Sequence, residues 1–600
     1  MDILFINDIH FSNSVDHPQI GQQILKNILC SNYSVECINF DYLNKEGLLS
    51  YEDDIDKTIA LCGEYILQFS PKIVGFYTIC NSFIFAIQIA EYIKNKEPGI
   101  KIILGGPHAS LTADECLKTF SFVDAISVGE SELTIEPLAK ALLENTSLNT
   151  VKNVVYRDNG EILHTQRERL LNNEELGEYT VFDYSPFKIS DKYTFELEGG
   201  RGCPFGCSFC STSMFWGRKY RVKPVQTLIS EMNTVNKMYG ITSFAILHDM
   251  FTANRTYITK FCSSLKNEGL NYKWTCSARA DSIDHEMLIA MKDAGCTSIY
   301  MGIETGSQER QAAINKNLDI KATLSTVKDM LSLGFDVTTS FIFGYPNETI
   351  EQFCDTVHLM EQMYIMGAQV QLHRFAPLPN TVEYSRSQGK MFFNEQSSDL
   401  AMYYDKYYTE KSKTLIKNHV DLFSQYYIVK SEIDDAYPQF DLFALMLSTV
   451  SLIFKYSIRY TIEYYGLQSL YFKLCEKFDM LQHEIRHVLI HNKSNEKEVA
   501  ILLCDTLVSA IDTACASNNG ISVVALFKYE KTKYEYFANP QKIPGTFEFD
   551  IDIERFINHH EVINQKTYIR FCNTDGDVKT SSVSGIHQLI QKYKESMEGV

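Results

Sequence analysis

The chain has 600 residues, a length that suggests roughly three or four domains and not a single core. Its net charge of −19 argues against a broad nucleic-acid surface, and its 45% apolar and 22% charged residues are typical of globular proteins. No apolar run is long enough to span a membrane, and the N-terminus lacks the pattern of a secretory signal. We therefore expect a cytoplasmic protein with reduced thiols and no nucleic-acid or membrane partner.

Residues 1–147 alternate apolar strands with amphipathic helices, which predicts an α/β fold with a doubly wound, Rossmann-like parallel sheet. Strands are expected at Ile3–Asn7, Val35–Phe40, Lys72–Thr78, Lys101–Gly106 and Asp124–Gly129. Ligands bind at the carboxyl ends of such strands, where the turns here carry glycine pairs and polar residues. The glycines would let a large flat or phosphorylated ligand approach the backbone, although ordinary turn chemistry explains them equally well.

The turns after the fourth and fifth strands read Gly-Gly-Pro-His-Ala-Ser at residues 105–110 and Gly-Glu-Ser-Glu at residues 129–132. They resemble the turns of the cobalamin-binding domain that precedes many radical SAM enzymes. The resemblance implies that cobalamin contacts Thr78, Gly105, Gly106, Pro107, His108, Gly129 and Glu130. The D-x-H-x-x-G loop of cobalt-ligating domains is absent, as is usual in this type. We therefore expect His108 at the cofactor periphery and not on the cobalt.

Residues 148–193 form a predicted connector with a hairpin at 154–164, because the Asn159-Gly160 pair suits a tight turn. Residues 194–381 then repeat the strand–helix pattern six times. Strands are expected at Phe195–Glu198, Ser243–His248, Tyr272–Ser277, Ser298–Ile303, Val337–Phe343 and Gln369–Phe375. Six such units predict a partial (β/α)6 barrel of the TIM type, with its active site at the carboxyl ends of the strands.

Three cysteines leave the first barrel strand in the spacing Cys203-x3-Cys207-x2-Cys210. Clustered thiolates suit zinc or an iron–sulfur cluster. Structural zinc usually takes four protein ligands, and no fourth cysteine or histidine stands at a matching spacing. Three thiolates would leave one iron of a four-iron cluster open for chemistry. The other cysteines are scattered along the sequence and predict no second tight cluster.

This loop, with Phe209 before its last cysteine, resembles the signature of the radical SAM superfamily, and the resemblance covers residues 195–380. It implies that Cys203, Cys207 and Cys210 bind a [4Fe–4S] cluster whose open iron binds S-adenosyl-L-methionine. The residues implied to contact this cofactor are Phe209, Asp249, Ser277, Arg279, Glu304, Phe341 and Pro377.

Two of these implied contacts have a structural alternative. The Arg279 guanidinium would suit the methionine carboxylate, or it would pair with Asp281 or Asp249. Glu304 would bind the ribose or the amino group, or it would be a rim carboxylate near a helix start.

Three further side chains near the barrel rim are candidates for roles beside the cofactor. His373 and Tyr345 could face the substrate, although residues of these types are more often packing residues. His248 stands where many relatives carry an acid, and this departure leaves its role open.

The pattern of residues 382–600 predicts a mostly helical α+β region that determines the substrate, and the helical layer of residues 382–485 could cover the open side of the barrel. Helices are expected at 400–414, 440–465, 467–490, 496–516 and 584–598, with a hairpin at 522–538.

The two resemblances together imply an enzyme that uses a [4Fe–4S] cluster, S-adenosyl-L-methionine and cobalamin. We expect C-methylation of an unactivated carbon in a peptide or a small natural-product precursor, with an electron donor such as flavodoxin or ferredoxin. Radical rearrangement, cyclisation or epimerisation is the alternative. The N-terminal cysteine pattern and the acidic charge disfavour a methylthiotransferase. A non-catalytic zinc or cobalamin sensor is an alternative of another class.

Overall fold

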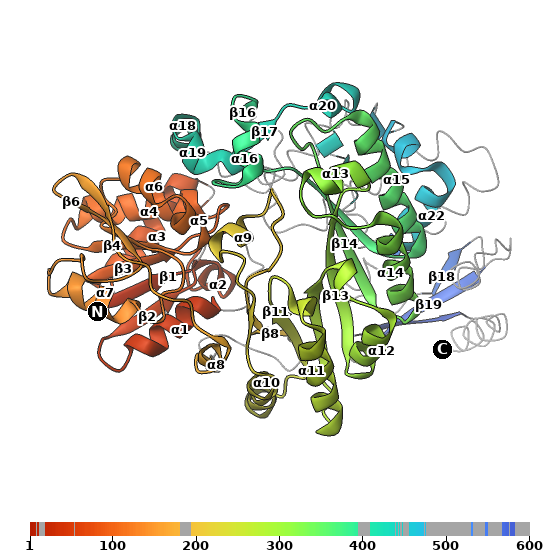
Figure 1. Ribbon diagram of the computed structural model, residues 1–600, viewed down its shortest axis with the longest axis horizontal. Helices are drawn as coiled ribbons and strands as arrows, with labels where there is room; N and C mark the ends of the chain where they lie inside the picture. The colour runs from red at the N-terminus through yellow and green to blue at the C-terminus, as the bar shows by residue number, and fades with distance from the viewer. Residues whose placement is uncertain are drawn as a thin grey trace, which may run out of the picture. The chain divides into compact units, whose positions relative to one another are not determined.

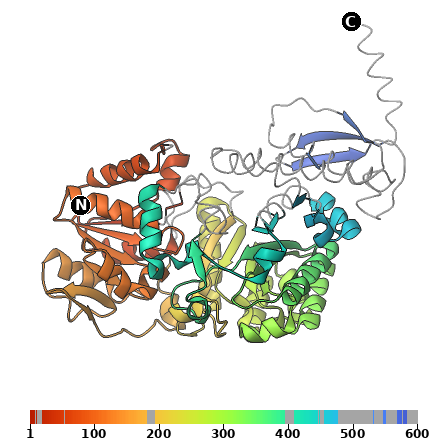
Figure 2. The same cartoon turned by 90° about the horizontal axis from the view of Figure 1, so that it is seen from above.

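The computed structural model describes residues 1–7, 9–10, 19–52, 54–180, 194–393 and 409–438, followed by the shorter stretches 440–441, 443–444, 447, 455–472, 474–475, 530–531, 546–549, 567–574 and 577–582. The chain divides into two compact units (Figures 1 and 2). The first contains Met1–Thr356 and His373–Pro438, and the second contains Val357–Leu372 and Gln439–Val600.

The first unit begins with a seven-stranded sheet in the order β2-β1-β3-β4-β5-β6-β7. Its parallel strands are β1 (Ile3–Ile6), β2 (Val35–Ile38), β3 (Ile73–Tyr77), β4 (Lys101–Gly105) and β5 (Ala125–Ser127). The predicted hairpin is present as β6 (Val154–Asp158) and β7 (Glu161–His164). It pairs antiparallel with β5, so the connector extends this sheet.

Helices cover both faces of the sheet because alternate side chains of each strand point to opposite faces. Leu4 and Ile6 pack in a core with α3 (Ile55–Leu67) and α4 (Phe83–Lys96), whereas Ile3 and Phe5 pack with α1 (Ile20–Leu29) and α7 (Ile135–Leu143). The remaining helices are α2 (Phe40–Lys45), α5 (Pro107–Leu111) and α6 (Ala113–Thr119). The predicted doubly wound architecture is confirmed.

The second sheet has six strands in the order β15-β14-β13-β12-β11-β8, which is the sequence order of a partial barrel. Its strands are β8 (Thr194–Glu198), β11 (Ser243–Leu247), β12 (Lys273–Ala278), β13 (Cys296–Glu304), β14 (Asp336–Phe343) and β15 (Gln369–Arg374). Its helices are α10 (Val225–Tyr239), α11 (Arg255–Asn267), α12 (His285–Asp293), α13 (Gln308–Ala313), α14 (Ile320–Ser332) and α15 (Ile350–Met366). The predicted (β/α)6 pattern is confirmed.

A small ribbon interrupts the first barrel unit, and the sequence did not predict it. It pairs β9 (Gly200–Arg201) antiparallel with β10 (Arg221–Val222), and α9 (Ser211–Phe215) lies between them in the chain. The cysteine loop is therefore held between the two strands of a ribbon.

Part of the segment after the barrel packs on the N-terminal domain, which the sequence did not predict, whereas Tyr437 packs against Phe353 of the barrel helix α15. Ile416 of α18 (Glu410–Asn418) and Phe423 of α19 (Val420–Phe423) belong to the same core as Phe83. Gln88 Nε2 donates to Ser412 Oγ at 3.0 Å. In both views these teal helices lie beside the red and orange domain (Figures 1 and 2). The same stretch of chain also contains α16 (Val382–Ser387), β16 (Met391–Phe393), β17 (Tyr427–Val429) and α20 (Glu432–Ala436). Asp434 of α20 pairs with Arg374 at the end of β15.

In the second unit the structure describes α22 (Lys455–Tyr465) and a three-stranded antiparallel sheet of β18 (Thr546–Phe549), β19 (Thr567–Thr574) and β20 (Asp577–Ser582). The sequence did not predict these strands. The helices expected at 496–516 and 584–598 and the hairpin expected at 522–538 lie largely or wholly outside the described residues. Among the helices of the described part of the chain, none is both long and apolar enough to cross a membrane.

Candidate functional site

A cavity of about 890 Å³ lies between the carboxyl ends of the two sheets in the first unit. The N-terminal domain contributes the turns after β3 and β4, with Tyr77, Cys80, Pro107 and His108. The barrel contributes residues that lie in or directly after β8, β11, β12, β13 and β14: Glu198, Ala245, Ile246, Leu247, His248, Asp249, Thr275, Cys276, Ser277, Ser298, Tyr300 and Thr338. The two edges where α/β sheets bind ligands thus share one space.

The cysteine loop borders this cavity through Ser211 and Thr212, which directly follow Cys210. Burial raises the pKa of the Cys203 thiol to about 11, and the neighbouring Cys210 and Cys207 add to the increase. The described residues contain no group of three or more His, Cys, Asp or Glu side chains arranged to hold a metal ion. The assignment of the three cysteines as cluster ligands therefore stays a prediction from their spacing and donor chemistry.

The surroundings of the loop suit an anionic cluster. Burial raises the pKa of Cys207, while the positive charges of Lys316 and Arg279 act in the opposite direction. These cations would stabilise thiolates, which are the form that binds metal. The donor set and its electrostatics therefore fit an iron–sulfur cluster.

The loop is fixed from three sides by groups outside it. Asp249, predicted to contact S-adenosylmethionine, accepts a hydrogen bond from Gly202 N at 2.9 Å, and burial raises the pKa of its carboxyl. Ser208 Oγ donates to Glu383 Oε1 at 2.6 Å, and Asn315 Nδ2 donates to Gly206 O at 2.7 Å. Asp249 lines the large cavity and also positions the first residue before Cys203.

The Arg279 guanidinium follows β12 and makes the alternative pairing that the sequence left open. Its Nε and Nη2 donate to the two carboxylate oxygens of Asp281 at 2.8 Å each, and Nη2 also donates to Lys316 O at 2.6 Å. It lies 3.9 Å from the ring centroid of Phe205, inside the cysteine loop. Nη1 is buried and has no partner in the described structure. One charged donor is thus available to a ligand carboxylate.

Glu304 ends β13 after an irregularity in the pairing with β14 and has a φ of 72°, which is unusual for a residue other than glycine. Its Oε1 accepts from Lys316 Nζ at 2.7 Å. Backbone strain of this kind is found at functional sites, where the surrounding structure maintains it.

The other residues predicted to contact S-adenosylmethionine divide into two groups. Ser277 lines the large cavity. The cavity is not lined by Phe209, Phe341 or Pro377. The ring of Phe209 lies edge-on to that of Tyr345, with 6.0 Å between the ring centroids, and Phe341 is fully buried. The carbonyl of Pro377 accepts a hydrogen bond from Ser424 Oγ at 2.5 Å.

The predicted cobalamin turns meet around a second cavity of about 360 Å³, whose lining includes Gly105, Gly106, Pro107, Gly129 and Glu130. Gly106 is needed for the close approach of two backbones there. Gly106 has a φ of 93°, and a Cβ on it would lie 2.6 Å from Thr78 O.

Thr78 joins the turns after β3 and β4 but does not line either cavity. Its Oγ1 donates to Gly105 O at 2.8 Å and accepts from Ala109 N at 3.1 Å. Thr78 therefore holds the two turns of the predicted cobalamin site together through these hydrogen bonds.

The two histidines at the large cavity are buried and uncharged at neutral pH. Burial lowers the pKa of His108 to about 4, and its Nε2 has no partner in the described structure. Burial also lowers the pKa of His248 to about 4. His248 Nδ1 accepts from Met250 N at 2.8 Å and its Nε2 lies 3.0 Å from Arg221 O, so this histidine secures the backbone.

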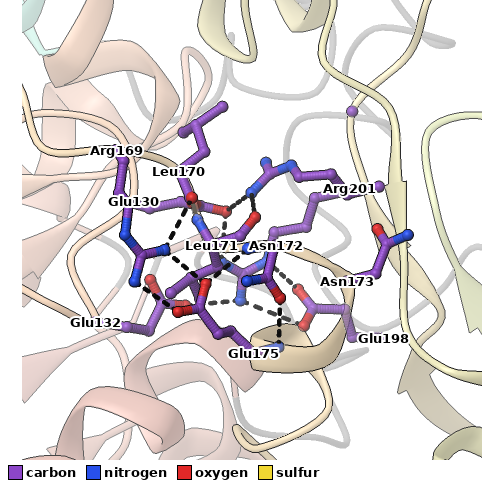
Figure 3. A network of polar contacts seen from close by, with 12 residues as sticks. Glu130, Glu132, Arg169, Leu170, Leu171, Asn172, Asn173, Glu175, Glu198 and Arg201 are labelled. Atoms are coloured by element: carbon purple, nitrogen blue, oxygen red, sulfur yellow. Dashed lines mark hydrogen bonds and ion pairs between the residues drawn. The ribbon is translucent and has the colours of Figure 1, made fainter.

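Glu130, predicted to contact cobalamin, is bound by protein partners that the sequence analysis missed (Figure 3). Its Oε1 pairs with Arg201 Nη1 at 2.9 Å and with Arg221 Nη1 at 2.6 Å, and its Oε2 accepts from Leu171 N at 2.9 Å. Arg201 also pairs with Glu132. The sequence feature that could have indicated this pairing is Arg201 itself, two positions before Cys203.

The fold also brings buried cysteines together that are scattered in sequence. The thiols of Cys276 and Cys296 share a hydrogen bond, and Cys262 is close enough to raise the pKa of Cys296 further above the value set by burial. Burial raises the pKa values of Cys262 and Cys296, so these two thiols are protonated and suit packing in the barrel core.

Two ligand-binding sheet edges share a cavity, one with a three-cysteine loop and one with glycine-rich turns, and this arrangement is typical of an enzyme with two cofactor sites. The family model for the radical SAM superfamily matches residues 197–360, and that for the B12 binding domain matches residues 12–139. The chain therefore combines a B12 binding domain with a radical SAM domain. Its cofactors are a [4Fe–4S] cluster, S-adenosylmethionine and cobalamin, as the sequence predicted.

Proteins similar to this chain include methyltransferases and a cyclase. An uncharacterized methyltransferase of Pyrococcus horikoshii is 29% identical over 61% of this chain and 77% of its own length. The anaerobic magnesium-protoporphyrin IX monomethyl ester cyclase of Rubrivivax gelatinosus is 27% identical over 49% of this chain and 54% of its own. The chain thus spans about half the length of the second relative.

A similar fold occurs in the radical S-adenosylmethionine methyltransferase TsrM of Kitasatospora setae, solved with cobalamin and a [4Fe–4S] cluster bound. The TM-score is 0.54 at 14% identity, over 69% of this chain and 83% of that one.

Proposed function

We propose that this enzyme transfers a methyl group to a carbon atom of a small substrate that binds in the 890 Å³ cavity. The shared cavity is the observation that carries the proposal, because methyl transfer requires a methyl carrier and a radical source to face one substrate. When bound, the cluster, S-adenosylmethionine and cobalamin supply the radical and the methyl group.

The residues of the chain bind and orient these groups. We assign Cys203, Cys207 and Cys210 to the cluster, with Lys316 and Arg279 balancing its charge. The buried, unpartnered Nη1 of Arg279 would donate to the carboxylate of S-adenosylmethionine. The turns of Gly106 and Gly129 would bring the backbone close to cobalamin.

The cavity lining disfavours an anionic substrate and offers hydroxyl groups to a polar one. Barrel interiors are usually filled by branched apolar side chains, but here Ala245, Thr275, Ser277 and Ser298 leave open space. The hydroxyls of Thr275, Ser277 and Ser298 make no hydrogen bond with any described residue, so they can bind polar groups of a ligand. Among the described residues of the lining, Arg201 is the one arginine or lysine, and its guanidinium is already paired with carboxylates.

We expect a small molecule without a negative charge, with a peptide precursor as the alternative. Reduction of the cluster needs an outside electron, for which we expect a flavodoxin or ferredoxin in the cytoplasm.

The test is anaerobic turnover of the reconstituted enzyme with S-adenosylmethionine carrying a trideuterated methyl group and a metabolite extract. Methyl transfer predicts an extract component that acquires the deuterated methyl group. Formation of 5′-deoxyadenosine with an unlabelled, cyclised or rearranged product would refute methyl transfer and favour the reaction type of the cyclase relative. The Cys207→Ala variant is the control and should form neither product.

A further inference from the structure

Arg201 occupies the junction between the two cofactor loops (Figure 3). It lies in β9, two residues before Cys203. Its Nε donates to Glu198 Oε1 at 2.7 Å, its Nη1 pairs with Glu130 Oε1 at 2.9 Å, and its Nη2 pairs with Glu132 Oε1 at 2.7 Å. Three carboxylates from two domains therefore surround one guanidinium.

The partners of Arg201 come from both cofactor sites. Glu130 and Glu132 belong to the turn after β5, whose residues line the second cavity together with Arg201 and Glu198. Glu198 ends the barrel strand from which the cysteine loop departs. A shift of one loop relative to the other would separate Arg201 from at least one carboxylate.

The geometry of this junction is specific to arginine. The planar guanidinium has five N–H donors in a fixed arrangement, whereas a lysine ammonium is a point charge on a flexible stem. Arg201, Glu130 and Glu132 are each less than 10% exposed, so every lost pairing would leave a buried charge.

A second arginine reinforces the same link. Arg221 lies opposite Arg201 in the β9–β10 ribbon, and its Nη1 contacts both Glu130 Oε1 at 2.6 Å and Leu171 O at 2.9 Å. The ribbon that carries the cysteine loop is thus attached to the turn after β5 by two arginines.

We propose that Arg201 is a positioning residue that sets the spacing between the cluster loop and the cobalamin turn. This inference rests on the cofactor sites and the methyl transfer of the proposed function. It extends that function by naming the group that keeps radical formation coupled to methyl transfer.

The test compares Arg201→Lys with the wild-type holoenzyme by electron paramagnetic resonance, with the cluster reduced and the cobalt in its paramagnetic divalent state. The magnetic interaction between the two centres reports their spacing without turnover. We expect Arg201→Lys to bind both cofactors but to change this interaction. We also expect the ratio of 5′-deoxyadenosine to methylated product to rise on the order of tenfold or more, because small displacements of reacting groups are costly.

A matched control is Arg169→Lys. Arg169 makes a two-point ion pair with Glu175 at 2.6 and 2.5 Å in the same region, but its side chain is 56% exposed. This variant should match the wild type in both readouts.

Glu132→Gln is a milder variant, since it removes one ion pair and leaves Glu130 and Glu198 in place. If Arg201→Lys fails to fold, Glu132→Gln tests the positioning role in its place. It should change the magnetic interaction and the product ratio in the same direction as Arg201→Lys, by a smaller amount. If the folded variants have the same magnetic interaction and the same product ratio as the wild type, the proposal is overturned. If the wild type forms no methylated product but its magnetic interaction still differs from that of the variants, the proposed methyl transfer is refuted and the positioning role of Arg201 is supported.

Discussion

Glu304 and Lys316 form a buried ion pair, with 2.7 Å between Oε1 and Nζ and with side chains that are 10% and 8% exposed. Lys316 lies close enough to Cys207 to oppose the rise in pKa that burial causes at that thiol. Its main-chain carbonyl accepts from Arg279. One lysine therefore links the carboxylate and the guanidinium predicted to bind S-adenosylmethionine with the cysteine loop.

Removing this lysine should destabilise the barrel. Lys316→Ala leaves the Glu304 carboxylate buried without its partner, which costs about 3–5 kcal/mol for a buried pair. Urea unfolding followed by tryptophan fluorescence measures this effect, because both tryptophans of the chain, Trp216 and Trp274, lie in the first unit.

Lys411→Ala is the control for Lys316→Ala. Lys411 pairs with Glu91 at the same distance of 2.7 Å, but the two side chains are 51% and 37% exposed. An exposed pair contributes at most about 1 kcal/mol, so this variant should unfold almost like the wild type. Equal losses in the two variants would contradict a special role for burial at Lys316.

The cysteine loop and the cobalamin turn should be separable by substitution. Cys207→Ala should eliminate the visible absorbance of the iron–sulfur cluster and retain cobalamin, since Cys207 lies outside both cavity linings. Cys30→Ala, at an exposed cysteine, should retain both cofactors. A colourless wild-type protein that contains zinc after anaerobic reconstitution would refute the cluster assignment.

Gly106→Ala should weaken cobalamin binding and spare the cluster. The substitution places a Cβ 2.6 Å from Thr78 O at a φ of 93°, so the turn after β4 must move. Gly160→Ala is matched in φ, at 87°, but its Cβ would meet nothing within 4 Å. We expect a loss of at least tenfold in cobalamin affinity for Gly106→Ala only, measured by absorbance titration. Equal affinity in both variants would exclude this turn from the site.

Local patterns in the sequence were sufficient to predict both sheets and the place of the cysteine loop, because strand periodicity and cysteine spacing involve nearby residues. They were not sufficient for Glu130, whose ion-pair partners Arg201 and Arg221 are 71 and 91 residues away. The turn motif predicts a cobalamin contact for Glu130, and Glu130 lines the second cavity, but packing decides what a carboxylate pairs with.

Arg279 is a second residue whose role the sequence could not decide. The sequence offered both a ligand role and a pairing with Asp281, and only the geometry shows that the pairing leaves Nη1 available. The docking of α18 on the N-terminal domain depends on contacts such as Gln88 with Ser412, which are 324 residues apart. No periodicity within the helix indicates that partner.

The pH dependence of stability should report on Glu348, which follows β14 and is 2% exposed. Burial raises its pKa from the usual 4.5 to about 7, although Arg310 and hydrogen bonds from Gly344 N and Tyr345 N act in the opposite direction. Between these two pH values the folded state binds more protons at this site than the unfolded state. The contribution of Glu348 is therefore most favourable below pH 4.5 and is lost as the pH rises through 7, at a cost of about 3 kcal/mol.

Glu348→Gln keeps the shape of the side chain and removes this titration. We expect the urea midpoint of the wild type to fall between pH 5.5 and pH 8 more steeply than that of the variant. Glu351→Gln, at a fully exposed carboxylate in the next helix whose pKa is lowered by hydrogen bonds from its own backbone N–H and Thr349, is the control and should retain the wild-type slope. If Glu348→Gln also retains that slope, then Glu348 is ionised in the folded protein at pH 5.5, and its two backbone hydrogen bonds outweigh its burial.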